Sequence, residues 1–326
     1  MKYLLISLSL ILFLTGCSTK KYFEPEDTEG QLKVEKESLP ADIKSMNRVG
    51  ATLENGQIIT KDGISKFKLP ENFDFLNVSA QGKVIATNYK DKILVGDEEL
   101  TIGDVVIAAS LKDDRLALVY SNNTVELIDM ANNKTLFKEY QPISLANDTR
   151  VTNPHFMGNL ILFPTLNGKV IIVSKKTNQS VKNISVDPDG EFNNIIYLSV
   201  IKELQTLVVA TPNKIVSISP EQILAKDYEL RDILVHDKEV FIATIDGQII
   251  KLTPSLEEIV KTKFKYSKIH SLAYTDSLYA IESQEFIIKL NNDFTSKKVY
   301  DFDFDSQERL IVLDNKVYNN KVYTLP

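Results

Sequence analysis

The sequence predicts an all-β protein, a β-propeller of seven or eight four-stranded blades, with eight the preferred number. Three observations lead to this fold class. An apolar strand, a polar turn and a second apolar strand recur about every 37 residues. Several of the turns are Asn-Gly or Asp-Gly, the strongest short signal for a β-hairpin. No stretch has the length and period of a long amphipathic helix, although 219–227 could form one or two helical turns.

The hairpins follow one another from residue 49 to the end of the chain. Isolated hairpins are marginally stable, so units of this size must stack or close on one another. Their turns include Asn55-Gly56, Asn167-Gly168 and Asp246-Gly247. The eight units begin at Val49, Val84, Leu116, Leu160, Leu207, Val240, Leu278 and Leu310.

Short apolar runs flank the hairpins and supply two further strands per repeat. Runs such as 104–110 and 269–275 precede a hairpin, and runs such as 134–140 and 257–264 follow one. Four short antiparallel strands in about 40 residues make one propeller blade. Seven blades would result if the first or last unit completes a shared blade. An Ala-Thr pair recurs at the end of the first hairpin strand, and we interpret it as packing at 51–52, 86–87, 210–211 and 243–244.

The N-terminus has the features of a secretory signal peptide over residues 1–16. Lys2 gives a positive start, an apolar run follows to Phe13, and small residues precede Cys17. The run is shorter than the roughly 20 residues that a membrane-spanning helix needs. We therefore expect cleavage and export.

Cys17 is the only cysteine of the chain and is predicted to carry lipid. Leu14-Thr15-Gly16-Cys17 resembles the bacterial lipobox, in which the cysteine is acylated and becomes the first residue of the mature protein. The alternative is an ordinary signal peptide followed by a chance cysteine. Several acyl chains on one residue suffice for stable anchoring. Ser18, where an aspartate would favour inner-membrane retention, suggests the outer membrane with the propeller facing the periplasm.

The expected organisation has three parts. Residues 1–16 form the signal peptide, residues 17–45 a lipidated flexible tether, and residues 46–326 the propeller. The tether is dense in charge and shows no sustained apolar period, although 31–36 could form a short helix. The net charge of −6 becomes −7 when Lys2 is removed with the signal peptide, and such an acidic protein is a poor nucleic-acid binder.

The residue pattern predicts neither a metal site nor a catalytic site. His155, His236 and His270 fall in different repeats with no carboxylate pattern beside them. The alternating acids of 301–306 lack the glycine and the glutamate of a calcium loop, so we expect a half-buried strand with a solvated acidic edge. Turn chemistry explains the acids of 186–191. No nucleophile elbow or phosphate-binding glycine loop occurs.

Residues 159–183 resemble the repeats of pyrroloquinoline-quinone-type propellers. They read as strand, Asn-Gly turn, strand, Thr-Asn turn and closing strand, and 122–139 repeats the pattern with Asp129 at a position where that family often has an aspartate. Together with the lipobox and the tether, the layout is similar to the BamB family of outer-membrane assembly lipoproteins. The family's repeats usually end in a tryptophan that packs between blades. This chain has no tryptophan, and Phe137 takes the place in one repeat.

The resemblance implies a non-catalytic scaffold without a cofactor. Quinone enzymes of this fold stack their cofactor on a tryptophan against a vicinal disulfide, and this chain has neither. The implied partner is the barrel-assembly machine of the outer membrane, bound through loops between central blades or by addition of a strand to an exposed sheet edge. The matching stretch is 228–237, where Arg231 and Asp232 are the predicted partner-binding residues. The alternative is a surface or periplasmic binding lipoprotein with an unrelated partner.

Overall fold

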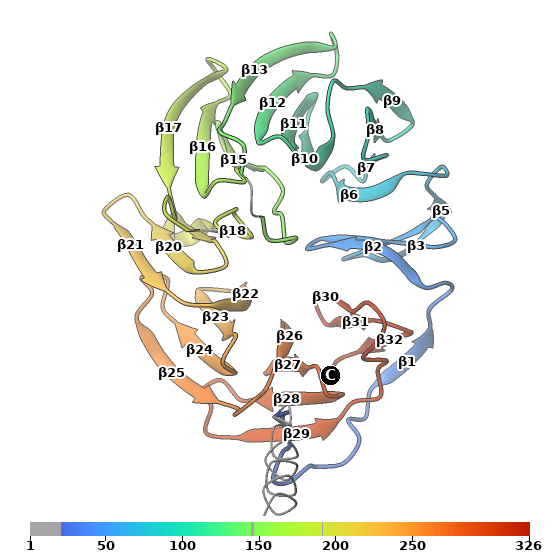
Figure 1. Ribbon diagram of the computed structural model, residues 1–326, viewed down its shortest axis with the longest axis vertical. Coiled ribbons are helices and arrows are strands. Elements are labelled where there is room, and N and C mark those ends of the chain that lie inside the picture. The colour runs from blue at the N-terminus through green and yellow to red at the C-terminus, as the bar shows by residue number, and fades with distance from the viewer. Residues whose placement is uncertain (1–20, 145–146, 191) are drawn as a thin grey trace, which may run out of the picture.

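The computed structural model describes residues 21–144, 147–190 and 192–326 of the chain. Eight four-stranded antiparallel sheets are arranged as blades around a central axis (Figure 1). This confirms the predicted propeller and the preferred number of blades. No helix in the described ranges is long and apolar enough to cross a membrane.

Strands follow the chain from the inner to the outer edge of each blade. Blades 1 to 4 comprise β2 (Ile43–Asn47), β3 (Gly50–Leu53), β4 (Gln57–Thr60) and β5 (Gly63–Lys68); β6 (Asp74–Val78), β7 (Val84–Thr87), β8 (Lys92–Val95) and β9 (Glu98–Thr101); β10 (Val106–Lys112), β11 (Arg115–Tyr120), β12 (Thr124–Asp129) and β13 (Lys134–Tyr140); and β14 (His155–Met157), β15 (Leu160–Pro164), β16 (Lys169–Ser174) and β17 (Gln179–Ser185). Blades 5 to 7 comprise β18 (Tyr197–Ile201), the 3₁₀ turn η1 (Lys202–Leu204), β19 (Thr206–Ala210), β20 (Lys214–Ile218) and β21 (Ile223–Asp227); β22 (Leu230–His236), β23 (Glu239–Thr244), β24 (Gln248–Leu252) and β25 (Glu258–Lys263); and β26 (Ile269–Tyr274), β27 (Leu278–Glu282), β28 (Phe286–Leu290) and β29 (Lys297–Asp301).

The eighth blade closes the ring with strands from both ends of the chain. It consists of β30 (Ile311–Leu313), β31 (Lys316–Tyr318), β32 (Lys321–Thr324) and the N-terminal strand β1 (Glu35–Ser38). β1 runs antiparallel to β32, with Glu35 opposite Thr324 and Ser38 opposite Lys321. An outer strand from the N-terminus therefore holds the first and last blades together.

This closure corrects the predicted flexible tether over the described part of residues 17–45. Phe23 and Leu32 are buried at 6% and 8% exposure, and β1 pairs within a sheet. Strand β1 could not be predicted from the sequence because all four of its residues are exposed. Backbone pairing rather than an apolar face holds the strand. Residues 1–16 and Cys17 lie outside the described residues.

Two shorter segments also differ from their predicted form. Residues 223–227 of the possible helix form the outer strand β21, whose alternating exposure suits an edge strand. The acidic stretch 301–306 lies mostly beyond the end of β29, yet Phe302 and Phe304 are buried as the alternation predicted. Asp303 stays exposed and pairs with Lys36 at 3.2 Å.

The core lies between the blades. Among the described residues, eight apolar clusters form, each joining two neighbouring blades. Phe137 packs against Phe163 of the next blade with ring centroids 6.1 Å apart, as expected for the residue in the tryptophan position. Thr52 of the first Ala-Thr pair accepts a 2.8 Å hydrogen bond from the Phe75 backbone nitrogen of blade 2. The repeated pair thus contributes to blade packing.

Candidate functional site

Five innermost strands share a bulge at one position. In β22, for example, Leu230 lies opposite Thr244 and Asp232 opposite Ala243, so that Arg231 is the extra residue. A bulge redirects the side chains on either side of it. The extra residues in the five strands are Lys44, Leu76, Ile107, Arg231 and His270.

The bulge gives the two predicted partner-binding residues opposite environments. The Arg231 side chain is exposed, whereas Asp232 is only 7% exposed. One carboxylate oxygen of Asp232 accepts a 3.0 Å bond from Arg48, and the other accepts a 2.8 Å bond from the Leu272 backbone nitrogen of blade 7. Asp232 is therefore a structural clamp, and only Arg231 remains available to a partner.

Arg48 connects blade 1 with blades 5 and 6, which are not its neighbours in the ring. Besides Asp232, its guanidinium donates to the Ile233 backbone oxygen at 3.0 Å and lies 5.0 Å from the centre of the Tyr197 ring. The Tyr197 hydroxyl accepts a 3.0 Å bond from Val235. These contacts narrow the centre of the propeller and fix the distance between blades on opposite sides.

Arg150 makes a second connection of this kind from the segment that precedes blade 4. It forms a two-point ion pair with Asp148 at 2.8 and 2.7 Å and donates to the backbone oxygens of Leu230 and Arg231 at 3.2 and 2.6 Å. Burial alone would raise the pKa of Asp148, but the hydrogen bonds from Arg150 lower it overall. Asp148 therefore stays ionised and holds the Arg150 side chain in place.

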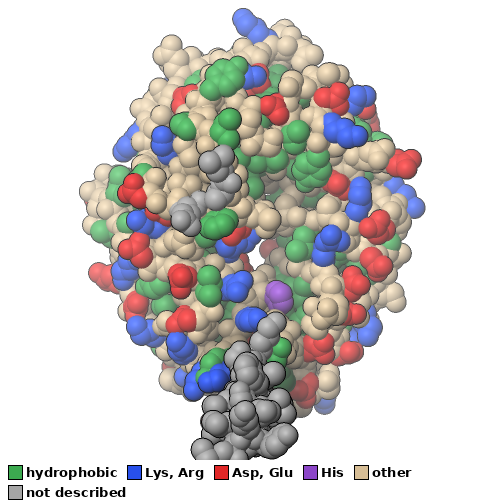
Figure 2. All heavy atoms as spheres, viewed as in Figure 1, with side chains coloured by type: hydrophobic (Ala, Val, Ile, Leu, Met, Phe, Trp, Pro, Cys, Tyr) green, Lys and Arg blue, Asp and Glu red, His purple; other side chains and the backbone are tan. Residues whose placement is uncertain are grey.

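His270 and Arg231 are electrostatic neighbours at the centre of the ring. Burial, and then the charge of Arg231, lower the pKa of His270. Figure 2 shows a histidine and basic side chains beside the central opening. A cationic side chain next to a mostly neutral imidazole can donate hydrogen bonds to acidic or carbonyl groups of a ligand.

The three histidines do not form one site. His155, in β14, has its pKa lowered by burial and by the charges of Lys202 and Lys112. His236 stacks on Tyr274 with centroids 4.1 Å apart. Within the described ranges, no group of three or more His, Cys, Asp or Glu residues is placed to hold a metal ion.

One end of the propeller carries the connections between blades, and we call it the inter-blade face. Large apolar side chains protrude from it, most of all Tyr140 and Ile143, each 73% exposed. Aromatic residues of this kind are enriched in protein interfaces. The exposed apolar residues of the inter-blade face are Phe67, Tyr89, Tyr140, Ile143, Phe192, Ile245 and Tyr266.

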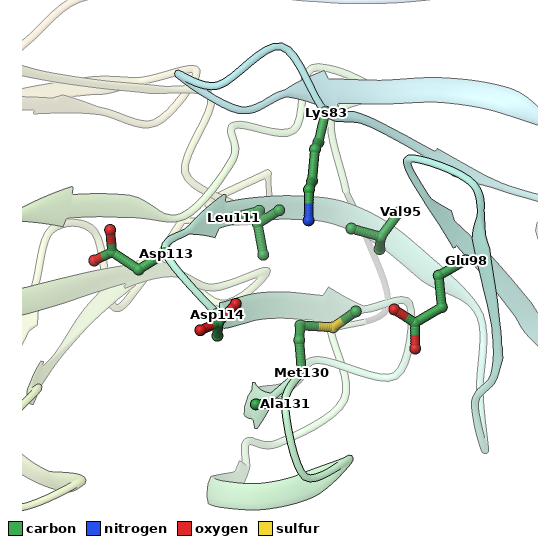
Figure 3. A pocket seen from close by; sticks show the side chains of 8 residues that line it. All are labelled: Lys83, Val95, Glu98, Leu111, Asp113, Asp114, Met130 and Ala131. Atoms are coloured by element: carbon green, nitrogen blue, oxygen red, sulfur yellow. The ribbon is translucent and has the colours of Figure 1, made fainter.

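The opposite end has a small hollow between blades 2 and 3 (Figure 3). Its volume is about 100 Å³, enough for a few water molecules. Lys83 extends into it between Leu111 and Val95, with Asp114 and Glu98 at its edges. The hollow is too small for an organic substrate, since ligand pockets usually measure at least about 300 Å³.

Arg48 and Arg150 were not predicted from the sequence. A usable signal was present, because the chain contains five arginines among 38 basic residues. Arginine is the side chain suited to buried, two-point contacts, whereas lysine serves exposed positions. Four of the five arginine side chains, those of Arg48, Arg115, Arg150 and Arg309, join segments distant in sequence, whereas Arg231 is exposed.

No family model matches the chain. Two curated proteins resemble it in sequence, both named plasminogen-binding protein PgbB, from Helicobacter pylori strains J99 and 26695. They are 27% and 28% identical over 385 aligned positions, covering 98% of this chain and 70% of each relative.

Solved structures show the same fold at low identity. BamB from Moraxella catarrhalis matches with a TM-score of 0.65 and 11% identity, covering 94% of this chain and 99% of that one. The designed propeller Ika8 matches at 0.57 and 16% identity over 91% and 99% of the two chains. AztD from Citrobacter koseri matches at 0.55 and 13% identity over 82% and 86%. The chain has a BamB-like, eight-bladed propeller fold.

Proposed function

We propose that this protein is a non-catalytic scaffold that binds another protein outside the cytoplasm of a bacterium and is held at the outer membrane by an acylated Cys17. The observation that carries the proposal is the similarity to plasminogen-binding proteins over 98% of the chain. It extends over the whole ring, so it concerns the propeller itself. The proposed ligand is accordingly plasminogen or a protein with the same binding features.

The inter-blade face is the surface we assign to this partner. Tyr140 and Ile143 lie close together in sequence at the end of blade 3, and Phe192, 47% exposed, follows blade 4. Exposed aromatic and aliphatic side chains of this size provide the anchors of protein interfaces. Arg231 at the centre of the ring adds a charge that can pair with an acidic group of the partner.

The test is direct binding of the full chain to immobilised plasminogen. We expect saturable binding that falls at least tenfold in the double variant Tyr140→Asp/Ile143→Asp, because truncation of interface anchors costs factors of this order. Lys134→Asp, on the exposed start of the same strand β13, is the matched control and should leave the affinity unchanged. Absence of binding by the unaltered chain would contradict the assignment of plasminogen.

A second candidate is a role in assembling outer-membrane barrels, which the BamB-like fold favours. In that case the partner would be the barrel-assembly machine, contacted through Arg231 while Asp232 holds the strand in place. An affinity pull-down from detergent-solubilised envelopes separates the candidates. Recovery of barrel-assembly subunits would support this one, and degradation of the propeller by protease added outside intact cells would favour the first.

A further inference from the structure

A cluster of lysines surrounds an exposed tyrosine where blades 6 and 7 meet on the inter-blade face. We call it the lysine–tyrosine patch, and it lines an open hollow of about 690 Å³. Tyr266 is 40% exposed and Ile245 46%. Figure 2 shows basic side chains gathered at the lower edge of the face in view. The patch consists of Lys21, Ile245, Lys263, Lys265, Tyr266 and Lys268.

The positive charge of the patch is largely unneutralised. Lys263 pairs with Asp246 at 2.7 Å, but no carboxylate in the described part of the chain lies within ion-pair distance of Lys21, Lys265 or Lys268. Lys21 and Lys265 lie 5.4 and 5.0 Å from the centre of the Tyr266 ring. Three lysines therefore carry a charge that no described carboxylate neutralises, and two of them, Lys21 and Lys265, lie against the Tyr266 ring.

The N-terminal segment is fixed to the propeller beside this patch. Phe23 is buried and contacts Phe264 and Phe286 edge-on, with centroids 6.0 and 5.7 Å away. The described chain therefore begins at Lys21, two residues from an anchored aromatic side chain. Cys17 precedes Lys21 by four positions, and four steps of fully extended chain span at most about 14 Å.

We propose that the lysine–tyrosine patch docks on the anionic phospholipid headgroups of the membrane that holds Cys17, an inference that rests on the acylation in the proposed function. The short reach of the chain brings the patch to the membrane surface. Lysines near an anionic leaflet are attracted to it, and tyrosine is enriched at the level of the headgroups. A basic patch next to a lipid chain is an established combination for membrane attachment.

Docking at this edge would orient the whole ring. Blades 6 and 7 would touch the membrane, while blades 2 and 3, which lie across the ring in Figure 1, would point away from it. Tyr140 and Ile143, at the end of blade 3, would then remain accessible to a protein partner. The patch and the proposed partner anchors Tyr140, Ile143 and Phe192 thus occupy different sectors of the inter-blade face.

The experiment uses the full acylated chain reconstituted in vesicles of neutral phosphatidylcholine, with or without phosphatidylglycerol. A fluorescent label on Gln284→Cys, in an exposed turn of blade 7 on the inter-blade face, reports proximity to quencher-bearing lipids. A label on Asp113→Cys, at the opposite end of blade 3, is the reference. We expect at least threefold stronger quenching of the Gln284→Cys label, only in the presence of phosphatidylglycerol.

Charge reversal tests whether the lysines cause the orientation. Lys265→Glu/Lys268→Glu should abolish the difference in quenching, whereas Lys90→Glu/Lys134→Glu, in blades 2 and 3, should preserve it. Equal quenching at both labels overturns the inference. Quenching that changes neither with phosphatidylglycerol nor with the charge reversal overturns it as well. An acidic protein that binds the patch while vesicles have no effect overturns it as well.

Mass spectrometry of the purified chain separates failure of this inference from failure of the proposed anchor. An unmodified Cys17 contradicts the anchor. The chain with unmodified Cys17 is then sedimented with anionic and neutral vesicles. A roughly fivefold loss of anionic-vesicle binding per reversed lysine supports the patch. Equal sedimentation of the unaltered and charge-reversed chains overturns it.

Discussion

Replacing Asp232 by alanine should destabilise the propeller although the residue lies beside its central opening. The substitution removes both carboxylate oxygens, of which one binds Arg48 at 3.0 Å and the other the Leu272 backbone nitrogen at 2.8 Å. The Arg48 side chain is 22% exposed and Asp232 is nearly buried, so water replaces these contacts poorly. Three blades lose a common point of attachment.

The size of the loss in the free energy of unfolding follows from the Arg48 charge that Asp232→Ala leaves unpaired. Removing one partner of a buried ion pair costs about 3–5 kcal/mol, because the other charge stays in place without compensation. The partial exposure of Arg48 favours the lower end, and we expect a loss of about 3 kcal/mol in the free energy of unfolding. The double variant Arg48→Ala/Asp232→Ala should lose less than the sum of the single variants, with a coupling of roughly 1–3 kcal/mol.

Equilibrium unfolding in urea, followed by far-ultraviolet circular dichroism, measures these differences. Arg231→Ala is the matched control, since the exposed neighbour in the same strand should change stability by no more than about 0.5 kcal/mol. If Asp232→Ala cost under about 1 kcal/mol, or if the two neighbours cost the same, the clamp would not exist as described.

Four further predictions follow from other contacts. Arg231→Gln should raise the pKa of His270 toward its usual value, because a like charge is removed, and should leave the His155 pKa unchanged in an NMR titration. Because desolvation lowers the pKa of half-buried His155 and of exposed His270 in the fold, their contribution to stability is complete above about pH 6.5 and is lost as the pH falls through their folded pKa values. Urea unfolding at a series of pH values checks this, and a flat profile would argue against lowered histidine pKa values. Phe163→Ala should cost about 3–5 kcal/mol in the same assay, since the ring is fully buried between blades 3 and 4, and a loss near zero would contradict the inter-blade core. Phe23→Ala should speed amide hydrogen exchange around residue 30 without slowing or speeding it in blade 3, and unchanged exchange in both places would show that Phe23 does not fix the N-terminal segment.

The ring could be predicted from sequence because each blade repeats local signals. Asn-Gly and Asp-Gly turns between apolar runs specify hairpins without reference to the rest of the chain. The aromatic position at Phe137 was also accessible, because the resemblance to pyrroloquinoline-quinone-type repeats marks the place at which their inter-blade tryptophan stands. Both signals act within about 40 residues, the scale on which sequence patterns are informative.

The closing strand and the central contacts depend on residues far apart in the chain. Glu35–Ser38 pairs with a strand almost 290 positions away, and its exposed, charged residues give no apolar pattern. Arg48 and Asp232 are separated by 184 positions. In the sequence Arg231 and Asp232 were an equivalent pair. Only the bulge in β22 shows that the Arg231 side chain is exposed to solvent, whereas Asp232 is buried and clamps three blades.

Crosslinking in intact cells tests most directly that the inter-blade face binds a protein. A photoreactive amino acid at Ile143 of the full chain should form a discrete covalent complex with plasminogen added outside the cells, or with barrel-assembly subunits within the envelope. The same group at Asp113, on the opposite end of the ring, should form neither complex. Equal complexes from both positions, or none from Ile143, would contradict a scaffold that binds its partner through this face.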